Sequence, residues 1–163
     1  MRRVAELGSL ADFTHMRLPT AKDISPKVGT DFEGNDERCA REHFLGKSLD
    51  EAEALFRQNA LYYEEDLLWM GAPAFRYYVP AFIRYIRSEH SCCDPDAINC
   101  FASLLEQRAE QADDVAVIAD ELADACRYIL DHYDKFAADP SIYGDLRPRY
   151  ELLLSRLHEI HVG

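Results

Sequence analysis

The chain has 163 residues, of which 48% are hydrophobic and 11% aromatic, and it carries a formal net charge of −12 at pH 7. This length and composition predict one globular domain with a full hydrophobic core, and they exclude a disordered chain. Because strong negative charge repels phosphate backbones and anionic lipid, we expect neither a nucleic-acid-binding protein nor a membrane-surface protein.

Most of the negative charge lies in the second half of the chain. Residues 89–145 contain fourteen acidic residues against Arg108, Arg127 and Lys135, whereas residues 1–60 are nearly balanced, with nine Lys and Arg against eleven Asp and Glu. This asymmetry has two explanations. The charge keeps the protein soluble, or it speeds the encounter with a basic protein partner.

The cysteines indicate a reducing compartment. Their number is odd and their spacing does not form a disulfide framework, so we expect free thiols and a cytoplasmic protein. The five are Cys39, Cys92, Cys93, Cys100 and Cys126. The sequence also predicts no secretory signal, because Glu6 and Gly8 interrupt the first apolar stretch, and no stretch approaches the ~20 apolar residues of a membrane span.

Residues 1–47 are predicted to be the least regular part of the chain. Short helices are predicted over Val4–Phe13 and Glu37–Phe44, the second one closed by Gly46. The prolines and glycines between them favour turns over long helices. These are Pro19, Pro26, Gly29 and Gly34.

The first long helix is predicted from Ser48 to Met70. Ser48 and Glu51 form a capping box, in which each side chain accepts a hydrogen bond from the other residue's backbone N–H. Gly71 and Pro73 end the helix. One helical face carries the apolar residues Leu49, Ala52, Phe56, Ala60, Tyr63, Leu67 and Met70.

A second helix is predicted from about Pro73 to Ser88. Pro80 lies inside it, removes one backbone hydrogen bond and clashes with the preceding turn, so we expect a kink or a break there. The core side of this helix carries Phe75, Tyr78, Val79, Phe82 and Ile86. The other side is predicted to carry Arg76, Tyr77, Arg84 and Arg87.

The acidic half is predicted to contain two neighbouring helices. Asp94 and Pro95 are typical of an N-cap and a first helical residue, and they predict a helix to about Ala109. The next helix is predicted over Asp113–Phe136, and the short turn before it predicts that the two pack antiparallel. One apolar stripe comprises Val115, Ile118, Leu122, Ala125, Cys126, Ile129, Tyr133 and Phe136. The opposite side carries Asp113, Asp120, Asp124 and Asp131.

The last helix is predicted over Pro148–His161, after a turn region at Asp139, Pro140 and Gly144. It is expected to bury Tyr150, Leu153, Leu154, Leu157 and Ile160. With five substantial helices and no run of period-two alternation, the sequence predicts an all-α, single-domain bundle of about five main helices. Its helical core would span residues 48–163, preceded by the irregular segment 1–47.

The row of four aspartates, Asp113, Asp120, Asp124 and Asp131, is the strongest candidate for function. We hypothesise that it binds a basic protein partner. Trp69 and Tyr77 would be the aromatic anchors if both are exposed. Two other interpretations stay open: the row is only solvated, or it pairs internally with Arg76, Arg84 and Arg87.

The aromatic residues are strongly clustered. Eight of the eighteen fall within the twenty-four positions 62–85. Rings that fill the seam between two helices account for most of them. The alternative is a small-ligand or metal-linked pocket, in which Tyr62 supplies a ring and a hydroxyl, and Arg84 or Arg87 holds an anion.

The remaining motifs do not favour catalysis or metal binding. His90, Cys92, Cys93 and Cys100 are close in sequence, but adjacent cysteines cannot easily point at one ion, so no metal site is expected. Phosphate-binding loops, dinucleotide-binding fingerprints and nucleophile elbows are absent from the sequence. The sequence therefore predicts a non-enzymatic protein without a cofactor.

One segment resembles a known class of proteins. The stretch Ala74-Phe75-Arg76-Tyr77-Tyr78-Val79-Pro80-Ala81-Phe82, within residues 48–86, resembles a motif of small uncharacterised bacterial helical proteins found beside toxin modules. Acidic helical partners act there as immunity proteins. The resemblance implies an inhibitor of a cognate toxin, transfers no catalytic residue and does not identify the toxin.

Overall fold

The computed structural model describes residues 16–163, and within this range the backbone is helical and contains no strand. The predicted all-α fold is confirmed. The predicted helix Val4–Phe13 lies outside the described residues. Within residues 16–163, six helices have ten or more residues: α2 (Asn35–Phe44), α3 (Leu49–Trp69), α4 (Ala72–Arg87), α5 (Pro95–Arg108), α7 (Ala119–Asp131) and α9 (Arg147–Val162).

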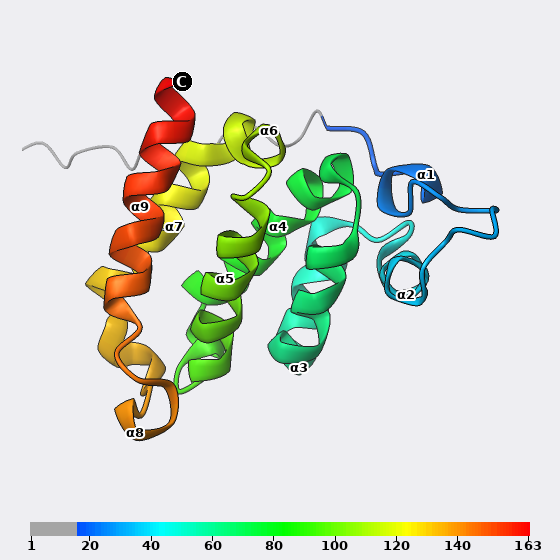
Figure 1. The fold of residues 1–163 in the computed structure, drawn as a ribbon. Coiled ribbons are helices and arrows are strands. Elements are labelled where there is room, and N and C mark those ends of the chain that lie inside the picture. The colour runs from blue at the N-terminus through cyan, green and yellow to red at the C-terminus, as the bar shows by residue number, and fades with distance from the viewer. Residues whose placement is uncertain (1–15) are drawn as a thin grey trace, which may run out of the picture.

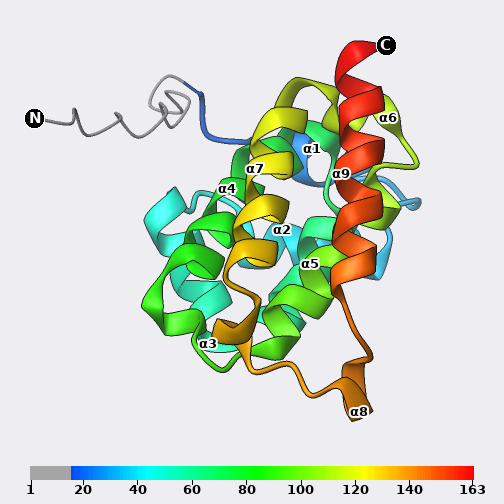
Figure 2. The same cartoon turned by 90° about the vertical axis from the view of Figure 1, so that its left-hand side faces the viewer.

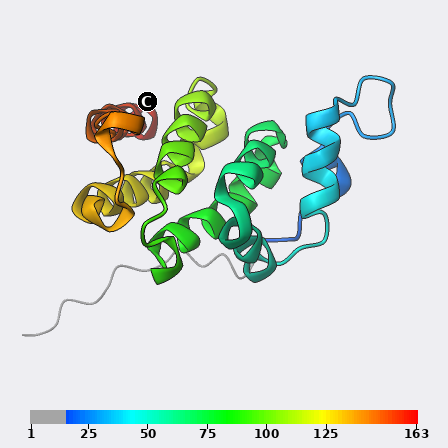
Figure 3. The same cartoon turned by 90° about the horizontal axis from the view of Figure 1, so that it is seen from below.

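The helices lie in a row (Figures 1 and 3). α7 and α9 form one end, α4 and α5 the middle, and α3 leads to α1 and α2 at the other end. Figure 2, seen from the α9 end, shows α7 and α9 side by side. The shorter elements are α1 (Ala21–Ile24), η2 (Glu89–Ser91), α6 (Ala112–Val115), η3 (Ala116–Ile118), η4 (Tyr133–Phe136) and α8 (Pro140–Tyr143).

The predicted capping box starts α3 as expected. The backbone N–H of Glu51 donates to Ser48 Oγ at 3.2 Å, and the N–H of Ser48 donates to the Glu51 carboxylate at 2.8 Å. The predicted continuity of this helix is wrong, because Asn59 adopts extended angles (φ −163°, ψ 93°) inside it. Asn59 Oδ1 accepts the N–H of Tyr62 at 3.0 Å, which is the bond of an N-cap. The second half of α3 therefore starts as a new helix.

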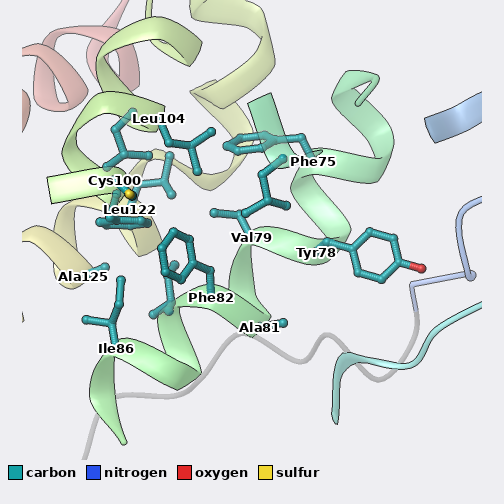
Figure 4. Packing of buried hydrophobic residues seen from close by; sticks show 14 of the residues in the cluster. Phe75, Tyr78, Val79, Ala81, Phe82, Ile86, Cys100, Leu104, Leu122 and Ala125 are labelled. Atoms are coloured by element: carbon teal, nitrogen blue, oxygen red, sulfur yellow. The ribbon is translucent and has the colours of Figure 1, made fainter. Parts of the chain in front are cut away.

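α4 runs through Pro80 without a break, so of the predicted kink or break, the break is wrong. Eleven of its sixteen residues are buried, including Pro80 itself, because α4 lies in the middle of the row. Figure 4 shows Phe75, Val79 and Phe82 of α4 facing side chains of α5 and α7. Pro80 removes one backbone hydrogen bond, which contributes about 1 kcal/mol net to stability. The burial of apolar side chains along this helix contributes more than that loss.

The predicted helix Asp113–Phe136 is divided into α6, η3, α7 and η4. Its apolar stripe is confirmed, because all of its predicted members are buried except the half-buried Tyr133. Near the first interruption, Arg76 of α4 donates to the backbone carbonyls of Asp113 (2.6 Å) and Asp114 (3.0 Å). These carbonyls are the acceptors that a continuous helix would use for its next turn. The β-branched residues Val115, Val117 and Ile118 further disfavour a regular helix.

The predicted antiparallel packing of α5 against the helix over residues 113–136 is not the main contact of that segment. α7 packs along α9, which also contacts α5. The break between α6 and α7 separates the short turn after α5 from the start of α7, so that the turn no longer dictates which helices are neighbours.

Residues 16–47 are more closely integrated than the sequence indicates. Ile24, Ala40 and Phe44 are fully buried. Gly71, between α3 and α4, donates its N–H to the carbonyl of Ile24 at 2.8 Å. A Cβ on Gly71 would lie 2.4 Å from the backbone oxygen of Asp23, so this close approach requires glycine.

Arg108, buried near the end of α5, links several elements. Its guanidinium donates to the carbonyl oxygens of Leu67 (2.6 Å) and Met70 at the end of α3. It also pairs with Asp114 of α6 at 3.2 Å and lies 4.5 Å from the ring centre of Phe75 in α4. The unpaired carbonyls of a helix end are thereby satisfied by a side chain from another helix. No helix within residues 16–163 is both long and apolar enough to cross a membrane.

Candidate functional site

Three of the four predicted aspartates share the exposed side of α7, and we call Asp120, Asp124 and Asp131 the acidic face. They are spaced four and seven residues apart, which places them on one side of a helix. Asp120 and Asp124 are well exposed, with 79% and 63% of their side-chain surface accessible. Asp113 is exposed too, but it belongs to α6, so the single-helix row consists of three residues.

Within the described chain, the acidic face has weak internal partners. Asp124 pairs with Arg127 on the same helix, and Asp120 lies 3.5 Å from His161 Nδ1. Exposed pairs of this kind contribute about 0–1 kcal/mol to stability. The carboxylates of the acidic face are therefore available to solvent or to a partner.

The arginines of α4 do not neutralise the predicted aspartates. Arg76 contacts Asp113 through the backbone carbonyl and not through the carboxylate. Arg84 pairs with Asp50 at 3.3 Å, and the guanidinium of Arg87 lies 5.7 Å from the ring centre of Tyr128. The interpretation that the aspartates pair with these arginines is therefore wrong.

Part of the acidic excess in residues 89–145 has a structural use. Four of these carboxylates are bonded to other elements: Glu106 to Arg149 (2.7 Å), Asp114 to Arg108 (3.2 Å), Asp94 to the hydroxyl of Tyr85 (2.6 Å) and Asp96 to the hydroxyl of Tyr143 (2.7 Å). Arg149 and Arg108 partly neutralise Glu106 and Asp114, whereas Asp94 and Asp96 keep their charge, and the acidic face is the most regular exposed part of the acidic excess.

Glu121 lies beside the acidic face on α7 but turns inward. Its Oε2 atom is buried and has no hydrogen-bond partner among the described residues. Burial raises the pKa of Glu121 to about 7, against the smaller opposing effect of Arg87 and Arg84. This carboxyl is half-protonated near neutral pH and adds less charge to α7 than its residue type suggests.

The two predicted aromatic anchors lie in different environments. Trp69 is half-exposed at the end of α3, as expected. The expected exposure of Tyr77 is wrong, because only 9% of it is accessible. It faces Met16 and Pro19 across a surface hollow, and α1 packs on α4 close by. Residues 16–24 lie beside this part of α4, which no pattern within the helix itself reveals.

The structure does not bring the predicted binding residues together. Trp69 lies toward the α2 end of the row, whereas the acidic face lies on α7 at the other end (Figure 1). The alternative ligand set is also divided: Tyr62 lies between α3 and α2, while Arg84 and Arg87 are engaged with Asp50 and Tyr128. Their roles in binding stay predictions.

A pocket between α2 and the second half of α3 contains residues that sequence reasoning missed. It has a volume of about 90 Å³, and we call it the α2–α3 pocket. Its lining comprises Asp36, Cys39, His43, Tyr62, Glu65, Asp66 and Trp69. The spacing of Tyr62, Asp66 and Trp69, and of Asp36, Cys39 and His43, is the available sequence signal, because residues three or four apart share one side of a helix.

A His–Asp pair forms part of the lining of this pocket. His43 Nδ1 is 2.7 Å from Asp66 Oδ2, and the Asp66 side chain is only 7% accessible. The imidazole is flanked by the rings of Tyr62 and Tyr63, whose centres are 5.5 and 5.4 Å away. Burial raises the pKa of Asp66, the bond to His43 lowers it, and nearby Glu65 raises it further. The pair fixes the imidazole orientation in a negatively charged recess.

In the part of the chain that the structure describes, the cysteines form neither a hydrogen-bonded Cys–His pair nor a metal site. Cys39 makes no hydrogen bond to His43 within the described part of the chain. Cys92 and Cys93 are exposed, with sulfur atoms 3.7 Å apart, whereas Cys100 is buried and its pKa is raised to about 12 by burial. Among residues 16–163, no group of three or more His, Cys, Asp and Glu side chains is placed to hold a metal ion.

Comparisons with known proteins add no relative. A scan against protein-family models, a search of curated proteins and a search of solved structures each return no match. The resemblance of residues 74–82 to immunity proteins therefore has no support from a relative, and it stays a prediction.

Proposed function

We propose that this protein is a non-enzymatic binding module that recognises a basic protein through the acidic face of α7. The observation that carries the proposal is the exposure of Asp120, Asp124 and Asp131 on one helix side, without strong internal ion pairs in the described chain. Like charges on one face repel each other, and a cationic partner relieves that repulsion.

The acidic face is suited to steering more than to tight contact. Exposed charges raise the rate of encounter with an oppositely charged protein, and their effect decreases as salt screens them. The buried aromatic and arginine contacts of an interface then determine how long the complex lasts. We therefore assign the acidic face to association, and we expect the main anchors elsewhere on the protein.

Within this function, the class that the resemblance implies is an immunity protein. Such a protein would act in the cytoplasm and neutralise a basic cognate toxin by occupying its surface. The free cysteines and the acidic character of residues 89–145 support this assignment. The identity of the toxin does not follow from either observation.

The test begins with capture of basic proteins from the native host at low salt, followed by elution with rising salt. The association rate of the recovered partner is then measured with wild-type protein and with the D120K/D124K variant. We expect at least a tenfold slower association at low salt and a flatter salt dependence.

The control variant is D31K/E42K, which makes the same change in net charge at exposed positions outside α7. If both variants slow association equally, general charge is responsible and the acidic face is not the site. An unchanged rate for D120K/D124K would also reject the proposal.

A further inference from the structure

The turn between η2 and α5 contains two adjacent cysteines, Cys92 and Cys93. Both are exposed, and their sulfur atoms are 3.7 Å apart. Cys39 is half-buried, while Cys100 and Cys126 are buried, and burial raises the pKa of both buried thiols to about 12. A cysteine reacts as the thiolate, so the exposed pair is better placed to react than either buried thiol.

The backbone holds the exposed pair in an unusual conformation. The N–H of Asp94 donates to the carbonyl of Ser91 at 3.1 Å, and Cys92 between them has φ −59° and ψ 130°. These are the angles of the second residue of a type II β-turn, which places Cys93 at the third position. That position requires a positive φ and is normally glycine or asparagine, yet Cys93 occupies it with φ 60°. Strained residues of this kind are concentrated at functional sites.

The same turn is bonded to three helical elements. The N–H of Cys93 donates to the carbonyl of Lys135 in η4 at 2.9 Å. The carboxylate of Asp94 accepts the N–H of Ala97 in α5 at 3.2 Å and the hydroxyl of Tyr85 in α4 at 2.6 Å. A chemical change at the cysteine pair would therefore act at a point where α4, α5 and η4 meet.

We propose that Cys92 and Cys93 are a redox modification site, at which a low-molecular-weight disulfide such as glutathione disulfide converts the two thiols into a vicinal disulfide. The sulfur atoms would move from 3.7 Å apart to about 2.05 Å, the length of an S–S bond. Exposed side chains rotate rapidly, so this approach needs only side-chain rotation and an adjustment of the turn. Disulfides that form in a reducing compartment are typically transient and serve redox sensing.

The conversion is a thiol–disulfide exchange in two steps. The thiolate of Cys92 attacks one sulfur of glutathione disulfide, the S–S bond of that molecule breaks, and one glutathione thiolate leaves. The thiolate of Cys93 then attacks the Cys92 sulfur of the mixed disulfide, and the second glutathione thiolate leaves. The two protons that the cysteines lose are taken up by the two glutathione thiolates. The protein is oxidised by two electrons, and glutathione disulfide is reduced to two molecules of glutathione.

The order of attack follows from the contact between the two sulfur atoms. The hydrogen bond with Cys92 and the charge of Cys92 raise the pKa of Cys93. Cys93 therefore keeps its proton when one thiol of the pair ionises, and Cys92 supplies the attacking thiolate.

The vicinal disulfide should be easily reduced. The Cα atoms of adjacent residues are about 3.8 Å apart, which is closer than the ~4.4–6.8 Å of most disulfides. Such a ring is strained, and strained, exposed disulfides are the labile and regulatory ones. An excess of reduced glutathione should therefore reopen it.

The test is intact-mass spectrometry of the full, reduced protein after incubation with excess glutathione disulfide. Free thiols are then blocked with N-ethylmaleimide in denaturant. We expect the wild-type pair to lose both blockable thiols and the mass of two hydrogen atoms, without retaining glutathione, and reduced glutathione should restore both thiols. The proposal is overturned by a stable glutathione adduct on the pair or by a covalent dimer. It is also overturned if the pair stays free after a simple thiol has exchanged fully under the same conditions.

Single variants show whether the two cysteines act together. Cys92→Ser and Cys93→Ser should each lose ring closure and retain one glutathione as a mixed disulfide, because the second thiol is missing. The matched control Cys39→Ser replaces a cysteine outside the turn and should close the ring like the wild type. Ring closure in either Cys92→Ser or Cys93→Ser would show that another cysteine forms the disulfide, and it would reject the pair.

Discussion

The acidic face of α7 and the α2–α3 pocket present carboxylates in opposite ways. On α7 the carboxylates are exposed and surrounded by water, whereas in the pocket Asp66 is buried beside aromatic rings. Water screens exposed charges and makes each worth little, while a partly buried charge interacts strongly with whatever reaches it. Solvation, more than the number of acidic residues, decides what each region can contribute to binding.

The largest expected effect comes from Arg108, which links the C-terminal end of α3 to α6 through its hydrogen bonds and ion pair. Arg108→Ala leaves the carbonyls of Leu67 and Met70 and the carboxylate of Asp114 without their donor. We expect a loss of about 3 kcal/mol in unfolding free energy, measured by urea denaturation. The exposed Arg127→Ala should change it by less than about 0.5 kcal/mol. If both variants lost a similar amount of unfolding free energy, burial would not be the reason why the buried and the exposed arginine differ in importance.

The second effect concerns the pocket itself. His43→Ala removes the partner of the buried Asp66 carboxylate, so the folded protein keeps an unsatisfied charge. We expect a loss of roughly 1–3 kcal/mol in urea denaturation. The control is His158→Ala, at an exposed position of α9, which should have no measurable effect. A neutral His43→Ala variant would contradict the structural importance of the pair.

The third effect depends on pH and concerns the inner edge of α7. Burial raises the pKa of Glu121 from an ordinary 4.5 to about 7, so the folded state keeps a proton that the unfolded state releases. Stability therefore falls as pH rises from about 4.5 to 7, and the loss is complete above that range. Glu121→Gln should remove this loss and add roughly 1–2 kcal/mol at pH 8, allowing for solvent screening.

Urea denaturation of Glu121→Gln at pH 5 and pH 8 measures this difference. The exposed Asp124→Asn serves as the control and should not alter the pH dependence. An equal effect of Glu121→Gln at both pH values would show that Glu121 is ionised and solvated in the folded protein, like its neighbours on the acidic face.

The smallest effect is expected at the acidic face. Asp131→Asn removes one exposed charge and should change the unfolding free energy by less than about 0.5 kcal/mol. It should slow association with a basic partner less than threefold, and only at low salt. The measurement is the association rate at two salt concentrations. A large loss of stability would mean that Asp131 has a structural role.

The sequence predicts the helices well where local chemistry decides them. The capping box of Ser48 and Glu51 and the Asp94-Pro95 start are both found, because a helix start depends on residues within one turn. The apolar stripe of the acidic helix is also correct, since periodicity reports which side faces the core.

The sequence does not predict interruptions that depend on tertiary contacts. Pro80 is tolerated because α4 is buried on most sides, whereas α3 is interrupted at Asn59, where the side chain caps a new turn. The helix predicted over residues 113–136 is interrupted close to the place where Arg76 donates hydrogen bonds to the backbone carbonyls of Asp113 and Asp114. The outcomes at Pro80 and near Arg76 depend on residues far apart in the chain, whereas the cap of Asn59 on Tyr62 is a local contact that the helical periodicity does not reveal.

The candidate site was predicted only in part for the same reason. The exposure of Asp120 and Trp69 follows from their place outside the apolar stripes. The burial of Tyr77 depends on α1 and residues 16–20, and the pairing of His43 with Asp66 joins residues twenty-three positions apart. Helical spacing indicates which side chains share a face, but it does not indicate which two faces meet.

The tight fit at Gly71 bears on where the smallest independently folding unit begins. A side chain at position 71 would clash with the backbone of Asp23. The chain between α3 and α4 therefore packs directly against the backbone of α1. A shortened protein beginning at Ser48 would leave the buried hydroxyl of Tyr78 without the carbonyls of Phe44 and Lys47 to which it donates. Residues 16–47 therefore contribute to the hydrophobic core, although their irregular sequence is typical of a flexible terminal segment.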